Sequence, residues 1–84
     1  EDITAIGAMK ALTASGLKIP GDVGVIGYNN SILAETASPA LTSVDNLAAA
    51  MARQAAELLV NRLQGKEVSR KIVLTPTLVI RESA

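Results

Sequence analysis

The first third of the chain reads as a helix, a tight turn and a short apolar strand, and this order of elements restricts the possible folds. Ile3, Ile6, Met9 and Leu12 recur at helical spacing and are expected to face the core. Gly16 stands where a left-handed residue ends a helix. Pro20-Gly21 forms the turn, and residues 23–27 resemble a parallel strand covered on both faces. The pattern predicts the second half of a β–α–β unit, which requires a parallel strand before the helix.

Two groups of polar residues are expected at one edge of this sheet. Asp2 would directly follow the strand that precedes the helix, and Asn29 and Asn30 follow strand 23–27. Ligands of open α/β sheets bind beyond the carboxyl ends of the strands. Asp2 also suits the N-cap of the helix, and asparagines often shape turns. The residues alone leave both roles open for each position.

The rest of the chain continues the alternation of helices and strands. A helical turn and loop are expected over 32–40, a strand over 41–44, and a helix over 47–64 that Asp45 or Asn46 caps. Two further strands are expected at 71–74 and 77–81. The predicted order is helix, strand, loop, strand, helix, strand, strand, in an α/β fold.

Composition indicates a domain with more apolar residues than its own small core can bury. The chain has 84 residues, 49% of them hydrophobic, and Tyr28 is its only aromatic residue. A chain this short has a marginal core, so its apolar excess predicts contact with another segment or subunit, or self-association. The opening Glu1-Asp2-Ile3 lacks an initiator Met, which predicts that the true N-terminus lies elsewhere and that this is a fragment.

Charge and residue types argue against several functions. Eight basic residues balance eight acidic ones, so DNA binding by this chain itself is not expected. Without histidine or cysteine, no serine is activated as a nucleophile, and no metal-ligand spacing is present. We therefore expect no enzyme, no cofactor and no metal. No apolar run reaches the ~18 residues of a membrane span, so no membrane partner is expected.

Several short motifs keep a fixed order along the chain. It opens with EDITAIGA, continues with GLKIPGDV, VIGYNN and PALTSV, and ends with LTPTLVIRESA. Together they resemble the lactose-repressor/galactose-repressor (LacI/GalR) family of bacterial transcription regulators over essentially all 84 residues. The resemblance implies a fragment of a doubly wound, periplasmic-binding-protein-like (type I) fold, in which two α/β lobes flank a ligand cleft.

The resemblance also divides the chain between the two lobes. Residues 1–41 are expected in the C-terminal lobe, residues 42–75 form a helix of the N-terminal lobe with its crossings, and residues 76–84 return to the C-terminal lobe. The chain is expected to pass from one lobe to the other near Val44 and to return near Thr75, and these two crossings are the expected hinges. The helix-turn-helix module that binds DNA in this family is absent from this chain.

The resemblance assigns ligand contacts to three positions. Asp2 matches an aspartate that accepts hydrogen bonds from ligand hydroxyls, although Glu1 replaces the usual asparagine before it. Asn46 stands where many members carry glutamine, and Asn29 stands where aspartate is common. The resemblance further implies a homodimer formed through helix Ile3–Ser15 and a cytoplasmic protein.

The implied function is that of a sensor of a small, sugar-like effector that controls operator binding by a LacI-type regulator. Two alternatives remain: the sugar-binding protein of an ABC transporter, and a stand-alone α/β interaction module. The Ile-Pro-Gly-Asp-Val turn and the Arg-Glu-Ser ending favour the regulator. A helix-turn-helix upstream would support the regulator, whereas a signal peptide would support the transporter protein.

Overall fold

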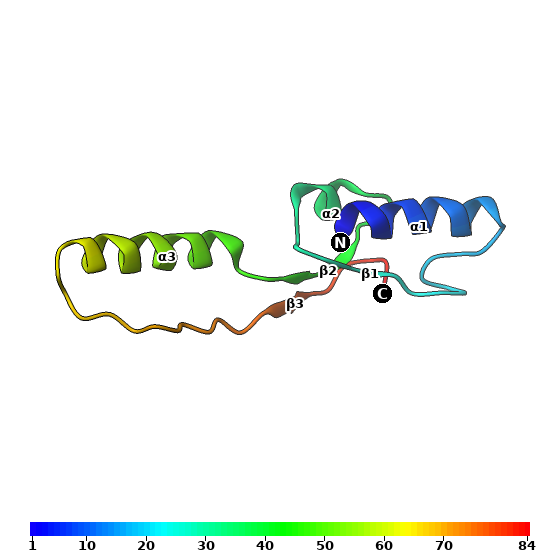
Figure 1. The fold of residues 1–84 in the computed structure, drawn as a ribbon. Coiled ribbons are helices and arrows are strands. Elements are labelled where there is room, and N and C mark those ends of the chain that lie inside the picture. Colours follow the sequence, from blue (N-terminus) through cyan, green and yellow to red (C-terminus); the bar gives the residue numbers. More distant parts are fainter.

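The computed structural model describes residues 1–84 as an elongated molecule of two unequal parts (Figure 1). Its extents are 60 × 16 × 16 Å. One part holds a small sheet with α1 and α2, and the other holds α3 and the extended segment that runs back alongside it (Figure 1). The elements are α1 (Asp2–Ala14), β1 (Ile26–Tyr28), α2 (Ile32–Thr36), β2 (Thr42–Asp45), α3 (Ala48–Leu63) and β3 (Thr77–Val79).

The sheet has three strands in the order β1-β2-β3. β1 and β2 are parallel, with Gly27 opposite Ser43, and β2 and β3 are antiparallel, with Val44 opposite Leu78. α1 and α2 lie on the same side of this sheet (Figure 1). The far side of β1 is a sheet edge without a partner among the 84 residues, which is where the sequence pattern places an additional parallel strand.

The core is small and lies where α1 packs on the sheet. Ala5, Met9, Ala34 and Leu41 are its buried hydrophobic residues. On α1 the buried positions are Asp2, Ala5 and Met9, at the spacing that places residues on one face of a helix. The prediction that Ile3 belongs to this face is wrong, because Ile3 is 62% exposed. Successive residues of a helix are rotated by about 100° about its axis, so Ile3, which follows Asp2, lies outside the packed face.

Strand β1 differs from its prediction in position and in burial. It begins at Ile26 rather than at Val23, and both Ile26 and Tyr28 are exposed. Alternate residues of a strand point to opposite faces, so Gly27 meets α1 while its neighbours point away from α1. The predicted coverage of both faces is absent because no helix of this chain packs on the second face.

Helix α3 forms where its pattern predicts, but none of its residues is buried. Met51 and Leu58 line a shallow groove with Ile72 and Leu74, and Leu63 is 78% exposed. Residues 71–74 are extended without a strand partner, so the prediction of a strand there is wrong. The observed order is helix, strand, helix, strand, helix, strand.

The turn after α1 and the end of the chain hold the sheet region together. Asp22 accepts a hydrogen bond of 2.8 Å from the backbone N–H of Lys18, which closes the turn between α1 and β1. Ser83 is fully buried: its hydroxyl donates to the carbonyl of Val25 (2.6 Å) and accepts from the N–H of Thr42 (2.8 Å). This serine therefore joins the starts of β1 and β2.

No helix of the structure combines the length and the hydropathy that crossing a membrane requires.

The close approach of α1 to β1 predicts that Gly27 tolerates no side chain. A Cβ there would overlap the Asp2 carboxylate and lie 2.7 Å from Cδ2 of Leu41. We expect Gly27→Ala to lower the free energy of unfolding by about 1–3 kcal/mol, the usual cost of overpacking. Denaturant-induced unfolding measures this change.

Gly7→Ala is the matched control, because nothing lies within 4 Å of a Cβ at Gly7. Alanine should leave stability unchanged or raise it by up to about 1 kcal/mol, since glycine is unfavourable inside a helix. Equal destabilisation by the two substitutions would contradict the close packing inferred at Gly27.

Candidate functional site

Polar side chains gather where β1 and β2 end. Asn29 and Asn30 follow β1, Asp45 ends β2, and Asn46 follows it. Asp2 joins them from the start of α1, because its carboxylate reaches the segment that follows β1. The sequence prediction that Asp2 and the Asn29–Asn30 segment share one edge of the sheet is thus confirmed.

The Asp2 carboxylate is buried, and both of its oxygens accept hydrogen bonds. The hydroxyl of Ser43 donates to Oδ1 (2.6 Å), and the backbone N–H of Ser31 donates to Oδ2 (2.7 Å). α1 includes Asp2 as its first residue, and no side chain caps the helix. The N-cap role considered for Asp2 is therefore wrong: its carboxylate joins α1 to β2 and to the start of α2.

The pKa of Asp2 lies below its ordinary value of 3.8. Burial alone would raise this pKa, but hydrogen bonds from Ser43 and Ser31 act in the opposite direction. Asp2 is therefore a carboxylate at neutral pH. Its oxygens have further lone pairs with which a carboxylate can accept hydrogen bonds.

Asn29 and Asn46 are in direct contact. The Nδ2 of Asn46 donates to Oδ1 of Asn29 at 2.8 Å. Asn29 has a φ of 107°, a backbone region that asparagine enters more readily than most residues. The Oδ1 of Asn46 is buried and has no hydrogen-bond partner in the chain. Asn46 does not cap α3, whose N-cap is Leu47.

A second polar group beside this pair was not predicted from the sequence. Arg81 donates from Nη2 to Oδ1 of Asn30 (2.8 Å), and Nδ2 of Asn30 contacts Oδ2 of Asp45 (3.4 Å). The N–H of Asn30 also donates to Oγ of Ser43 (3.0 Å), which connects this group to Asp2. Arg81 lies 51 residues beyond Asn30 in sequence, so no local pattern indicates their contact.

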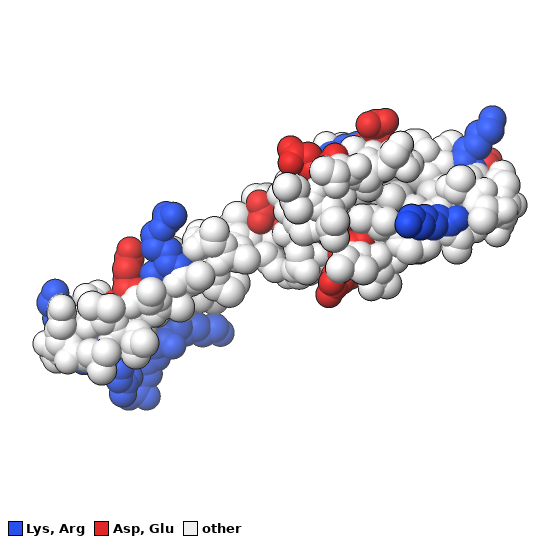
Figure 2. All heavy atoms as spheres, turned by 90° about the horizontal axis from the view of Figure 1, so that it is seen from above, with Lys and Arg blue, Asp and Glu red and all other residues white.

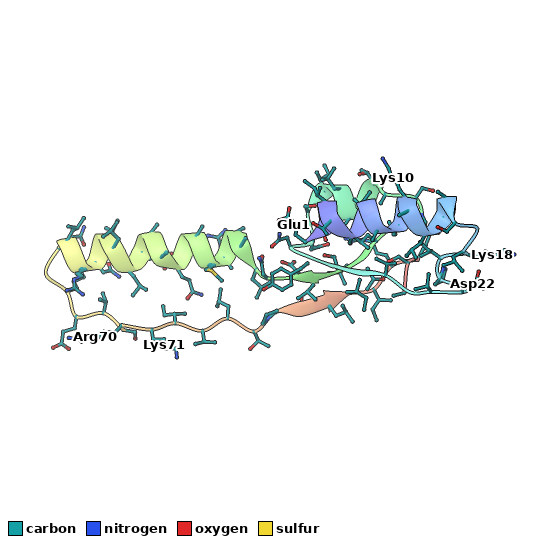
Figure 3. All side chains as sticks on the ribbon, turned by 45° about the vertical axis from the view of Figure 1, so that its right-hand side comes forward. Glu1, Lys10, Lys18, Asp22, Arg70 and Lys71 are labelled. Atoms are coloured by element: carbon teal, nitrogen blue, oxygen red, sulfur yellow. The ribbon has the colours of Figure 1, made fainter.

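The charges of the molecule are distributed unevenly. In Figure 2, Lys and Arg side chains gather mainly at the end formed by α3 and the segment after it. In Figure 3 the labelled Arg70 and Lys71 lie next to each other on the segment that follows α3, whereas Glu1 and Lys10 lie at α1, in the other part of the molecule. No three Asp or Glu side chains converge as metal ligands would. The edge at the strand ends instead combines carboxylates, amides and hydroxyls, groups that exchange hydrogen bonds with a neutral, hydroxyl-bearing molecule.

Comparison with known proteins places the whole chain in one family. Residues 1–84 match the model of the periplasmic binding protein-like domain. The chain is 41% identical over 83 residues to the HTH-type transcriptional regulator CelR of Thermobifida fusca, an alignment covering 98% of the chain and 24% of the relative. The chain therefore spans about a quarter of the length of this curated relative.

Solved structures show the same fold. A transcriptional regulator CelR–cellobiose complex superposes with a TM-score of 0.92 at 40% identity, over 100% of this chain and 26% of that one. A dimeric Lac repressor with a C-terminal deletion superposes with a TM-score of 0.88 at 30% identity, over 94% of this chain and 29% of that one. The chain belongs to the family of periplasmic binding protein-like domains and matches a part of that domain as LacI-type transcription regulators carry it.

Proposed function

We propose that this chain is the C-terminal part of the effector-binding domain of a cytoplasmic, LacI-type transcription regulator. The observation that carries the proposal is the polar edge at the ends of β1 and β2, which unites Asp2, Asn29 and Asn46. These are the three positions to which the family resemblance assigns ligand contacts. The relatives in the comparisons are regulators rather than transport proteins or enzymes, which supports this function over the alternatives.

The proposed effector is a small, neutral, sugar-like molecule. Asn46 offers a buried amide oxygen without a partner, and an unpartnered polar atom is costly unless a ligand or water satisfies it. A ligand hydroxyl can donate to this oxygen, and another can donate to the Asp2 carboxylate. The cellobiose bound by the CelR relative belongs to this chemical class.

The two parts of the structure fit the proposed division between two lobes. Residues 1–41 and 76–84 include α1, α2, β1 and β3 and would form one wall of the cleft. β2 pairs with both β1 and β3, so this wall would extend to residue 45 rather than end at residue 41. α3 would belong to the other lobe, and the chain would cross between the lobes near Val44 and Thr75. Effector binding would favour one arrangement of the lobes and so alter the spacing of DNA-binding modules that lie outside these residues.

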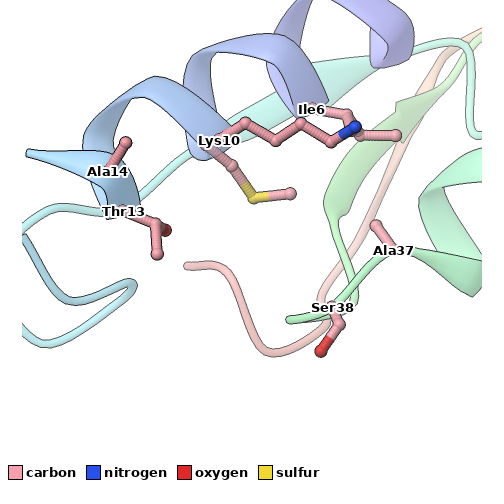
Figure 4. A pocket seen from close by; sticks show the side chains of 7 residues that line it. Ile6, Lys10, Thr13, Ala14, Ala37 and Ser38 are labelled. Carbon is pink, nitrogen blue, oxygen red and sulfur yellow. The ribbon is translucent and has the colours of Figure 1, made fainter.

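We also propose a homodimer formed through helix α1. A groove of about 550 Å³ runs between α1 and the segment after α2, where Ile6, Lys10, Thr13 and Ala14 face Ala37 and Ser38 (Figure 4). The exposed Ile3 extends this apolar surface along the helix. The dimeric Lac repressor among the related structures supports the assignment.

The effector proposal predicts a specific loss of binding. In the full-length protein, Asn46→Ala should weaken the binding of cellobiose or a related sugar about tenfold, the effect of losing about one hydrogen bond. Isothermal titration calorimetry measures the dissociation constant. Asn61→Ala, on α3 and away from the polar edge, should leave this constant unchanged. Unchanged sugar binding by the Asn46 variant would contradict the proposal. A separate expectation concerns residues 1–84 alone, which hold only one wall of the proposed cleft and should not bind the sugar tightly.

The lowered pKa of Asp2 predicts how stability depends on pH. A carboxylate whose pKa falls on folding stabilises the protein fully above its unfolded pKa, and this contribution is lost as the pH drops through the lower, folded pKa. Asp2→Asn should therefore destabilise the protein at pH 7, and its difference from the wild type should shrink as the pH falls below about 3.8. Urea unfolding at several pH values tests this, and a constant difference would count against the charge role of Asp2.

The dimer proposal predicts that a large charged side chain in the α1 groove disrupts association. Ala14→Arg should raise the dimer dissociation constant at least about tenfold, because a buried unpaired charge at an interface is costly. Sedimentation equilibrium of the full-length protein measures the constant. Ala8→Arg is the control, because Ala8 is exposed and does not line this groove. Equal effects of the two variants would argue against this face.

A further inference from the structure

Little packing holds α3 to the sheet within this chain. None of its residues is buried, and α3 stands beyond the end of the sheet (Figure 1). Within this chain, α3 is connected to the sheet by residues 45–47, through which the chain passes from β2 into α3, and by the extended segment that returns alongside α3 to β3. Residues 45–47 are the shorter of the two connections and fix where α3 begins. Leu47, the last of these, has a left-handed φ of 57°, which is unusual for leucine and requires support from its surroundings.

Asp45 provides part of that support. Its Oδ1 accepts a hydrogen bond of 2.8 Å from the N–H of Leu47. Its other oxygen, Oδ2, faces Nδ2 of Asn30 at 3.4 Å. One carboxylate thus contacts both the backbone that begins α3 and the segment that follows β1.

Asn30 in turn connects Asp45 to Arg81. The Oδ1 of Asn30 accepts from Nη2 of Arg81, whose Nη1 donates to the carbonyl of Leu41 (2.9 Å). The amide is oriented with its oxygen toward the cation and its nitrogen toward the carboxylate. A polar relay therefore runs from Arg81 through Asn30 and Asp45 to Leu47.

We propose that Asn30 is a positioning residue whose amide, held by Arg81, sets the direction in which α3 leaves the sheet through Asp45 and Leu47. Asn30 is distinct from the three residues to which effector contact is assigned. An effect of Asn30 on the response to effector rests on the proposed function, in which α3 belongs to the opposite lobe. The relay itself is a property of this chain and can be tested without effector.

The order of charges along the relay provides a sharp test. Asn30→Asp keeps an acceptor for Arg81 but places a carboxylate against Asp45, so the two like charges repel each other. The double variant Asn30→Asp/Asp45→Asn reverses the donor and the acceptor. The carboxylate introduced at position 30 would then pair with Arg81, and the amide introduced at position 45 could donate to that carboxylate while still accepting from the N–H of Leu47.

The measurement is hydrogen–deuterium exchange of the effector-free, full-length protein. Asn30→Asp should speed exchange of the amides of residues 47–51 about three- to tenfold, the loss expected for one ordinary hydrogen bond. The amides of α1 serve as the internal reference and should keep their rates. The double variant should restore the rates at 47–51, and Asn61→Asp, the same change on α3, should leave them unaltered.

Three results would overturn the proposal. The first is an unchanged rate at residues 47–51 in Asn30→Asp, and the second is failure of the double variant to restore that rate. The third is an equal increase in α1, which would show general destabilisation. If Asn30→Asp does not fold, Asn30→Ala removes both contacts without adding charge, and the same comparison of 47–51 with α1 applies. Absence of sugar binding would contradict the proposed function but leave this result unaffected.

Discussion

The attachment of α1 to the sheet depends on one buried carboxylate. Asp2 is the only charged residue among the buried ones, and it lies directly against Gly27 of β1. Burying a charge is costly unless hydrogen bonds compensate for it, and Ser43 and Ser31 supply them. With only four buried hydrophobic residues in the core, this polar contact is a large share of what fixes the helix. The same contact places Asp2 at the edge where the strands end.

A carboxylate in this position has a structural and a proposed functional role at once. Its hydrogen bonds to Ser43 and Ser31 orient it, while its charge is retained at neutral pH. The neighbouring Asn46 oxygen has no partner within the chain. An acceptor that two hydrogen bonds hold in place and an acceptor without a partner therefore lie at the same edge of the sheet. Under the proposed function, hydroxyl groups of a ligand would donate to both.

Periodic patterns predicted most helices and strands but not their burial. The helical spacing in α1 and α3 and the apolar run before β1 are local signals, and they located these elements to within a few residues. Burial depends on which partner covers each face, so Ile3 and Ile26 were wrongly assigned to covered positions. The predicted strand at 71–74 failed for the same reason, because a strand is defined by a neighbour. The edge position of Asp2 was predictable, since the carboxyl ends of parallel strands meet there, whereas the contacts of Arg81 span about half the chain and have no local pattern.

The place of Ser83 in the structure has a consequence for how the chain folds during synthesis. This serine joins the start of β1 to the start of β2, yet it lies 58 residues after Val25 and 41 residues after Thr42. Until residue 83 leaves the ribosome, the backbone groups it satisfies have no such partner. The helices can form while the chain is still being made, because their contacts are local. The sheet, in contrast, reaches its final pairing only after translation has passed this residue, so the nascent chain exposes its unfinished strands until then.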